Sequence, residues 1–166
     1  KPDLAQRSAD LVRLRDAFRR RAVEMDAAIR ADFGHRSQHE NLISESMIVL
    51  AEIELALRKL RAWSRPRRAR VGWKFWPARA QVRPSPLGVV GIISPWNYPV
   101  NLALVPLASA IAAGNHVYLK PSEHAPRTSA WLRDLLADVF PEDRVAVALG
   151  GSAVGAAFSA LPFDHL

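Results

Sequence analysis

Cysteine is absent from the 166-residue chain. This absence excludes disulfide bonds, thiolate metal sites and a Cys nucleophile within these residues. The longest apolar run, Val100 to Ala113, is interrupted by Pro106 and is shorter than the roughly 18 residues that cross a bilayer. The opening Lys1-Pro2-Asp3 starts no secretory signal. We therefore expect a cytoplasmic protein without a membrane span, and the missing initial Met suggests that the numbering begins inside a longer chain.

The chain has 16 acidic residues against 23 Lys and Arg residues, and the net charge is +7. The basic residues concentrate between Arg58 and Arg83, where four aromatic residues are interleaved: Trp63, Trp73, Phe75 and Trp76. Such a stretch could bind nucleic acid through phosphates and base stacking. The other interpretation is a basic connector whose aromatic side chains pack on a neighbouring domain or subunit. None of the motifs of the common nucleic-acid-binding modules occurs nearby, so we expect the connector and no nucleic-acid partner.

The first 64 residues have the pattern of a helical region. Apolar residues recur at helical steps and predict one helix that ends at Gly34, a residue suited to the left-handed position after a helix: Leu11, Leu14, Phe18, Met25 and Ile29. Ser37 and Glu40 have capping-box spacing and predict the start of a second helix. Its expected apolar stripe continues to about Arg61: Ile43, Met47, Leu50, Leu57 and Leu60. These two helices should form an antiparallel pair.

Residues 65–86 differ in character from the helical region. Four prolines exclude a long helix here: Pro66, Pro77, Pro84 and Pro86. The stretch should be irregular apart from a short strand from Ala80 to Arg83, and we place a domain boundary in it.

Residues 87–166 alternate between strand and helix patterns. The expected strands are 88–94, 116–120 and 145–149, the expected helices are 99–113, 126–140 and 152–160, and residues 163–166 look like the start of a fourth strand. This order predicts an α/β fold in which right-handed crossovers build part of a doubly wound parallel sheet. Ligands of such sheets bind beyond the carboxyl ends of the strands.

Polar residues and glycines follow each expected strand. Asn97 could donate a hydrogen bond to a carbonyl oxygen that becomes an oxyanion, or it could cap the following helix. Lys120 and Glu123 could both reach the hydroxyls of a ribose, or they could form a surface ion pair. The carboxylate would repel a 2′-phosphate, which favours NAD and leaves NADP open.

The glycines after the third strand give a weaker signal. Gly150, Gly151 and Gly155 do not form the GxGxxG fingerprint, so a phosphate or adenine site and a simple turn remain equally open. The five histidines form no pattern of metal ligands, and we expect no metal site.

Two of these segments together resemble the aldehyde dehydrogenase superfamily. The stretch from Pro86 to Pro99, which contains Pro95-Trp96-Asn97-Tyr98-Pro99, resembles its catalytic-Asn loop. Ala112-Ala113-Gly114-Asn115 leading to Lys120-Pro121-Ser122-Glu123 resembles its ribose-binding segment. The stretch Asp32-Phe33-Gly34-His35-Arg36-Ser37 is similar to the coniferyl-aldehyde dehydrogenase branch.

The resemblance implies a Rossmann-like sheet and assigns roles to the residues. Residues 87–166 would be an incomplete NAD-binding domain, and Asn97 would help to form the oxyanion hole. Lys120 and Glu123 would hold the adenosine ribose. The cofactor-binding set implied in full is Ser94, Pro95, Trp96, Lys120, Ser122, Glu123, Gly151 and Gly155.

The resemblance also implies a reaction that this chain cannot complete. The family oxidises aldehydes to acids through a Cys thiohemiacetal, transfers hydride to NAD(P) and uses a Glu general base. Both residues lie later in family members, so we expect the amino-terminal portion of an NAD(P)-dependent enzyme that is inactive alone. Its partners would be an aldehyde (coniferyl, another aromatic or a long-chain one), the remaining catalytic domain and further copies in a homo-oligomer. The alternative is a non-catalytic nucleotide-binding or scaffolding module.

Overall fold

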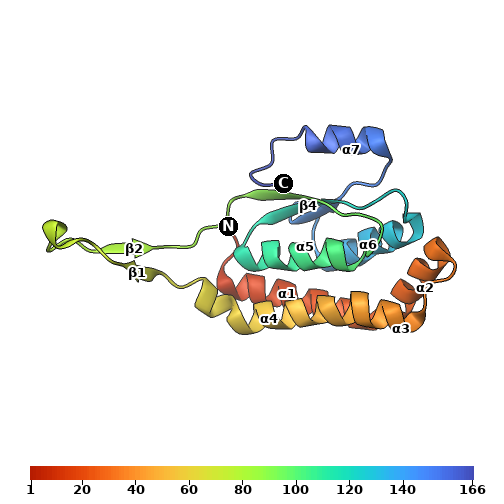
Figure 1. Ribbon diagram of the computed structural model, residues 1–166, viewed down its shortest axis with the longest axis horizontal. Coiled ribbons are helices and arrows are strands. Elements are labelled where there is room, and N and C mark those ends of the chain that lie inside the picture. The colour runs from red at the N-terminus through yellow and green to blue at the C-terminus, as the bar shows by residue number, and fades with distance from the viewer.

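The computed structural model describes residues 1–166, and it begins with two helices where one was expected. These are α1 (Leu4–Arg20) and α2 (Ala22–Phe33) (Figure 1). The Asp3 side chain caps α1 by accepting a hydrogen bond from the Gln6 backbone N–H at 2.7 Å. Arg21 leaves the helical conformation, with a ψ of 15°, and divides the predicted single helix. The predicted end at Gly34 is confirmed, because this residue has a φ of 72°.

The second helical segment starts where the capping box predicted but is not uniform. It consists of α3 (Gln38–Asn41), the π-helical turn η1 (Leu42–Met47) and α4 (Ile48–Trp63). The Ser37 hydroxyl accepts a hydrogen bond from the Glu40 N–H at 3.1 Å. The expectation that Ile43 and Met47 join the buried stripe is wrong, because both are exposed. The wider π turn changes which residues face inward, and the buried stripe resumes in α4 with Val49, Ile53, Ala56 and Leu60.

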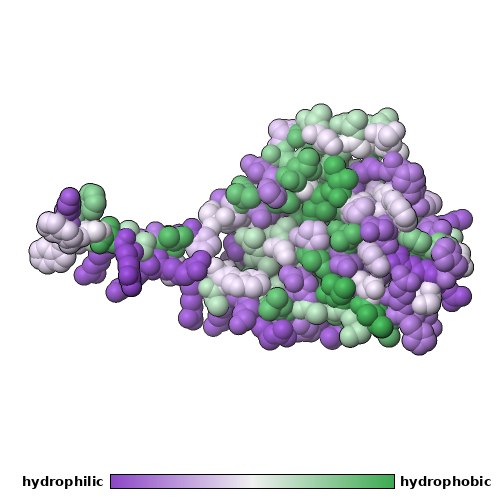
Figure 2. All heavy atoms as spheres, in the orientation of Figure 1, coloured by the Kyte–Doolittle hydropathy of each residue, from purple (hydrophilic) through white to green (hydrophobic).

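Residues 65–86 form a projecting hairpin, which we call the arm. Strands β1 (Arg67–Ala69) and β2 (Ala80–Val82) pair antiparallel, and the 3₁₀ turn η2 (Trp73–Phe75) lies between them. The predicted strand is β2, whereas its partner β1 lies in a stretch expected to be irregular. Figure 1 shows the arm extending away from the rest of the chain, and Figure 2 shows that most of its length is hydrophilic.

The predicted parallel sheet is present. It consists of β3 (Val89–Ile93), β4 (His116–Lys120) and β5 (Val145–Val147) in the order β3-β4-β5. Helices α5 (Asn101–Ala113) and α6 (Pro126–Val139) make the crossovers on one face, and α7 (Ser152–Ser159) lies on the other (Figure 1). The fold class expected from the sequence is therefore confirmed.

The order of the strands reverses at β3. Residues 163–166 return to the free edge of β3, where Val90 and His165 form a parallel bridge and the Gly91 N–H donates to the His165 carbonyl at 2.8 Å. The first crossover therefore leaves β3 toward β4, and the last segment arrives on its other side. This reversal is a topological switch point, where doubly wound sheets bind their ligands.

One core joins the helical region to the sheet. Helices α1 and α4 pack beneath α5 and α6, and the buried cluster takes side chains from both layers, among them Phe18, Ile53, Leu104, Leu119 and Leu132. A buried ion pair also connects the layers, because the Arg144 Nε lies 3.2 Å from Asp10 Oδ2 of α1. None of the helices combines the length and the hydrophobicity that crossing a bilayer requires.

Candidate functional site at the carboxyl edge of the sheet

The carboxyl ends of β3 and β4 lie side by side. The Ser94 N–H donates a hydrogen bond to the Lys120 carbonyl at 3.1 Å, which continues the sheet pairing by one residue. Ser94 is buried, and its hydroxyl oxygen has no hydrogen-bond partner within the chain. An orphaned buried hydroxyl is unusual in a folded protein.

Lys120 and Glu123 form a short ion pair at this edge. The Lys120 Nζ lies 2.5 Å from Glu123 Oε2, and the Lys120 side chain is buried while that of Glu123 is about one third exposed. The hydrogen bond from Lys120 lowers the pKa of the Glu123 carboxyl below its usual value. Glu123 therefore offers an ionised acceptor to the solvent side, with an ammonium donor directly behind it.

Helix α7 lies against the Lys120 side chain. A Cβ placed on Gly155 would lie 3.8 Å from Lys120 Cε, which is ordinary van der Waals contact. Gly151 is exposed and precedes the first residue of α7. The structure thus brings Ser94, Lys120, Glu123 and Gly155 into one place.

Ser122 has a local role in this edge. Its hydroxyl accepts a hydrogen bond from the His124 N–H at 3.2 Å, and its carbonyl accepts one from the Ser129 hydroxyl at 2.9 Å. These bonds fix the turn between β4 and α6. The Ser122 side chain therefore holds the shape of the loop that presents Glu123.

Asn97 lies in the middle of the loop from β3 to α5. The residue is exposed, and its carboxamide makes no hydrogen bond within the chain, so the amide is free to donate to a ligand. It forms no hydrogen bond with the Lys120–Glu123 pair. Pro95 and Trp96 precede it and are exposed, and the Trp96 ring lies 6.3 Å from the ring of Phe33.

Two charged residues that sequence reasoning missed hold this loop. Arg36 Nη1 donates a hydrogen bond to the Asn97 carbonyl at 2.7 Å, and Glu45 Oε2 accepts one from the Asn101 N–H at 2.6 Å. Arg36 belongs to the segment used for the resemblance, whereas Glu45 lies two residues from Ile43 and Met47 and would face away from the expected apolar stripe of a regular α-helix. No local pattern in the sequence therefore marks Glu45 as buried.

Burial perturbs the Glu45 carboxyl. The side chain is inaccessible to solvent, and this desolvation raises the pKa of Glu45 from 4.5 to about 7. The Asn101 N–H, the charge of Arg36 and the Val100 N–H oppose the shift, while Glu40 adds to it. Glu45 therefore changes its charge near neutral pH.

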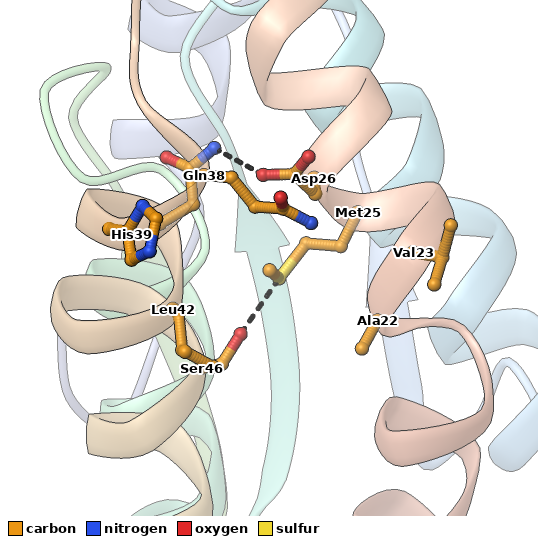
Figure 3. Close-up of a pocket in the computed structure, with 9 residues that line it drawn as sticks. Ala22, Val23, Met25, Asp26, Gln38, His39, Leu42 and Ser46 are labelled. Atoms are coloured by element: carbon orange, nitrogen blue, oxygen red, sulfur yellow. Dashed lines mark hydrogen bonds between the residues drawn. The ribbon is translucent and has the colours of Figure 1, made fainter.

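A pocket of about 260 Å³ lies elsewhere, between α2 and the α3–η1 segment (Figure 3). Asp26 and Asn41 line it and are joined by a 2.8 Å hydrogen bond, and the Ser46 hydroxyl donates to the Met25 sulfur at 4.0 Å. The lining includes none of the predicted site residues. The candidate site is therefore the carboxyl edge of the sheet rather than this pocket.

No group of three or more His, Asp or Glu side chains lies close enough to hold a metal ion. The chemistry available at the edge of the sheet is that of one free amide, one ammonium–carboxylate pair and one orphaned hydroxyl. Such a set can hydrogen-bond the hydroxyls of a sugar and an oxygen atom that gains negative charge.

Comparison with known proteins defines the class. The aldehyde dehydrogenase family model matches residues 1–162. The chain therefore belongs to the aldehyde dehydrogenase family, as its motifs predicted.

Among curated proteins, the chain is similar to two from Pseudomonas. It is 50% identical over 165 residues to a "Probable coniferyl aldehyde dehydrogenase" of Pseudomonas aeruginosa, which covers 99% of this chain and 35% of that protein. It is 46% identical over 139 residues to the coniferyl aldehyde dehydrogenase of Pseudomonas sp. strain HR199, covering 84% of this chain and 28% of that protein. The chain thus spans about a third of the length of these relatives.

Solved structures share the fold. The substrate-bound AldH of Staphylococcus aureus aligns with a TM-score of 0.94 at 29% identity, over 97% of this chain and 35% of that one. An aldehyde dehydrogenase of Mycobacterium tuberculosis complexed with NAD+ aligns with a TM-score of 0.83 at 25% identity, over 99% of this chain and 33% of that one.

The raised pKa of Glu45 predicts a pH-dependent stability. Between pH 4.5 and about 7 the native state retains a proton that the unfolded state releases, so the free energy of unfolding should fall as pH rises. The full effect is about 3 kcal/mol, since one pKa unit corresponds to about 1.4 kcal/mol. Urea unfolding of the chain and of Glu45→Gln should show the variant gaining relative stability across this window. A difference that is independent of pH, or that changes in the opposite direction, would contradict the assignment.

Proposed function

We propose that this chain supplies the cofactor-ribose site and the carbonyl-polarising amide of an NAD(P)-dependent aldehyde dehydrogenase. The observation that carries the proposal is the ion pair of Lys120 and Glu123 at the carboxyl end of β4, next to the switch point of the sheet. The 46–50% identity to proteins named as coniferyl aldehyde dehydrogenases favours coniferyl aldehyde or a similar aromatic aldehyde as the substrate. The product would be the carboxylic acid.

The residues at the sheet edge fit the ribose of a dinucleotide. The Glu123 carboxylate can accept hydrogen bonds from the two ribose hydroxyls, and the Lys120 ammonium can donate to one of their oxygen atoms. Ser94, with its orphaned hydroxyl, Pro95 and Trp96 would line one side of the ligand. Gly151, which precedes α7, and Gly155, which lies within it, would line the other side, and Ser122 would fix the loop between β4 and α6. Bound NAD would supply the acceptor for the hydride of the aldehyde.

The ionised Glu123 favours NAD over NADP. A 2′-phosphate would place a second negative charge against a carboxylate that hydrogen bonding to Lys120 keeps ionised. Lys120 cannot compensate fully, because its side chain is buried and already paired.

Asn97 would act on the substrate carbonyl. Its carboxamide is unpaired and exposed, while its backbone carbonyl is held by Arg36. The side-chain N–H can donate a hydrogen bond that strengthens as the carbonyl oxygen gains negative charge. The chain has no cysteine, so the nucleophile would come from sequence outside these residues, and this chain alone would be inactive.

The arm would contact a second copy in a homo-oligomer. Trp73, Phe75 and Trp76 at its tip are 83%, 66% and 85% exposed, and large aromatic side chains in such numbers are typical of interfaces. The arm projects from the body, so these side chains are within reach of another molecule (Figure 1).

The function is tested with a chimera in which this chain replaces the matching segment of the Pseudomonas aeruginosa relative. The chimera should oxidise coniferyl aldehyde with NAD, and Asn97→Ala should lower kcat by about 10²- to 10³-fold, the usual effect of losing one oxyanion donor. Gln38→Ala, which removes an exposed amide outside the loop, should leave kcat unchanged. Stopped-flow absorbance of NADH gives the rates. Full activity of Asn97→Ala would contradict the role of the amide.

The ribose site is tested in the same chimera by calorimetric titration of NAD. Glu123→Gln should weaken NAD binding by about 10-fold, because it removes a charged acceptor of the ribose hydroxyls. Glu123→Gln should also lower the ratio of NAD affinity to NADP affinity. Asp134→Asn is the matched control, since it removes a carboxylate from the exposed Arg133–Asp134 pair on α6. Equal effects of the two substitutions on NAD binding would place the ribose elsewhere.

The interface is tested by sedimentation velocity of the chimera. Trp73→Ser combined with Phe75→Ser should shift the protein toward a smaller species, because the aromatic contact area is lost. Val23→Ser, which removes an exposed apolar side chain on α2, should not alter the distribution. An unchanged sedimentation profile of the arm variant would show that the arm is not part of the interface.

A further inference from the structure

The loop that contains Asn97 is held in its middle and at its end by the helical region. In the middle Arg36 donates to the Asn97 carbonyl, and at the end Glu45 accepts from the Asn101 N–H, which begins α5. A second bond, from Asn101 Nδ2 to the Ser44 carbonyl at 3.0 Å, fixes the same end. Helices α2 and α3, which flank Arg36, lie at the end of the molecule where the loop enters α5 (Figure 1).

Arg36 is held rigidly in this position. Its guanidinium carbon lies 4.7 Å from the centre of the Phe33 ring and 4.5 Å from that of Tyr98, so aromatic faces pack against it. Its Nη2 also lies 3.2 Å from Glu40 Oε1. Tyr98 directly follows Asn97, so Arg36 contacts two consecutive residues of the loop.

The π turn places Glu45 next to Arg36, and we call these two residues with Glu40 the charged cluster. In η1 the chain makes i→i+5 turns, and Glu45 is fully buried while its neighbours Ile43 and Met47 are exposed. Such π-helical turns are frequent at functional sites. Glu45 Oε1 lies 3.8 Å from Arg36 Nη1, so the two charges face each other beneath the loop.

The charged cluster is not optimised for stability. Arg36 Nε and Glu45 Oε1 are buried without a hydrogen-bond partner, and the side chains are 5% and 0% exposed. Buried ion pairs with unsatisfied atoms are replaced by apolar residues without loss of stability in several proteins. Arg36 and Glu45 are nevertheless placed against the loop that presents the free Asn97 amide. This placement favours a role in positioning that amide.

We propose that Arg36 and Glu45 are positioning residues that fix the backbone from which the Asn97 carboxamide projects, an inference that rests on the proposed role of Asn97. With the backbone held at residues 97 and 101, the carboxamide can move only by rotation of the Asn97 side chain. Displacement of a reacting group by about 1 Å can lower a rate by 10²-fold. The helical region therefore contributes to the reaction without touching the substrate.

The test uses the chimera and a double-mutant cycle. Arg36→Met should lower kcat by about 10- to 100-fold and leave the dissociation constant of NAD within about 2-fold, because the ribose site lies at β4. In the Asn97→Ala background, Arg36→Met should cause no further loss, since a residue that acts through Asn97 has no effect once the amide is gone. Arg30→Met, which removes an exposed arginine of α2, is the matched control and should retain kcat.

Conservative variants distinguish positioning from general destabilisation. Arg36→Lys keeps the charge and one donor, and Glu45→Gln keeps an acceptor for the Asn101 N–H, so both should lose less activity than Arg36→Met. If Arg36→Met does not yield folded protein, Arg36→Lys takes its place in the cycle, with the same expected non-additivity.

The outcomes separate the two proposals. An unmodified chimera without activity, or an active one in which Asn97→Ala has no effect, would contradict the proposed function. An active chimera that loses activity with Asn97→Ala but retains it with Arg36→Met would overturn the positioning role alone. So would losses from Arg36→Met and Asn97→Ala that multiply in the double variant.

Discussion

The position of β3 between two parallel neighbours is the constraint on which the candidate site depends. Backbone hydrogen bonds connect β3 to β4 on one side and to residues 164–165 on the other. Because β3 and β4 run parallel, the loops that follow them emerge at the same edge of the sheet. The Lys120–Glu123 pair and the Asn97 loop share an edge of the sheet for this reason, although no hydrogen bond or ion pair joins them.

The two layers of the protein hold different residues of this edge. The sheet and α7 define the surroundings of Lys120, whereas the helical region defines those of Asn97 through Arg36 and Glu45. Helix α5 belongs to both layers, because it starts at the Glu45 contact and packs against β3, β4 and α4. A displacement of the helical region would therefore reach the Asn97 loop through α5.

The sequence predicted most of the fold because local signals and burial agree there. Gly34 and Ser37 mark a boundary that the structure confirms, and the β-branched run after Gly88 is a central strand. The break at Arg21 was not predictable, since neither Gly nor Pro marks it. The π turn was also missed, because the burial of Glu45 is set by Asn101, 56 residues away. The hydrogen bond from Arg36 to Asn97 spans 61 residues and has no local signal either.

The distribution of charge limits how copies of the chain can meet. The arm contains the seven basic residues Arg65, Arg67, Arg68, Arg70, Lys74, Arg79 and Arg83 and no acidic residue, which equals the net charge of +7 of the whole chain. The remainder is therefore balanced in charge. Two arms placed against each other would bring like charges together, and the arm has no acidic residue to offset this repulsion. In the proposed oligomer the repulsion disfavours contact between two arms, so each arm would place its aromatic tip on a different surface of a neighbour.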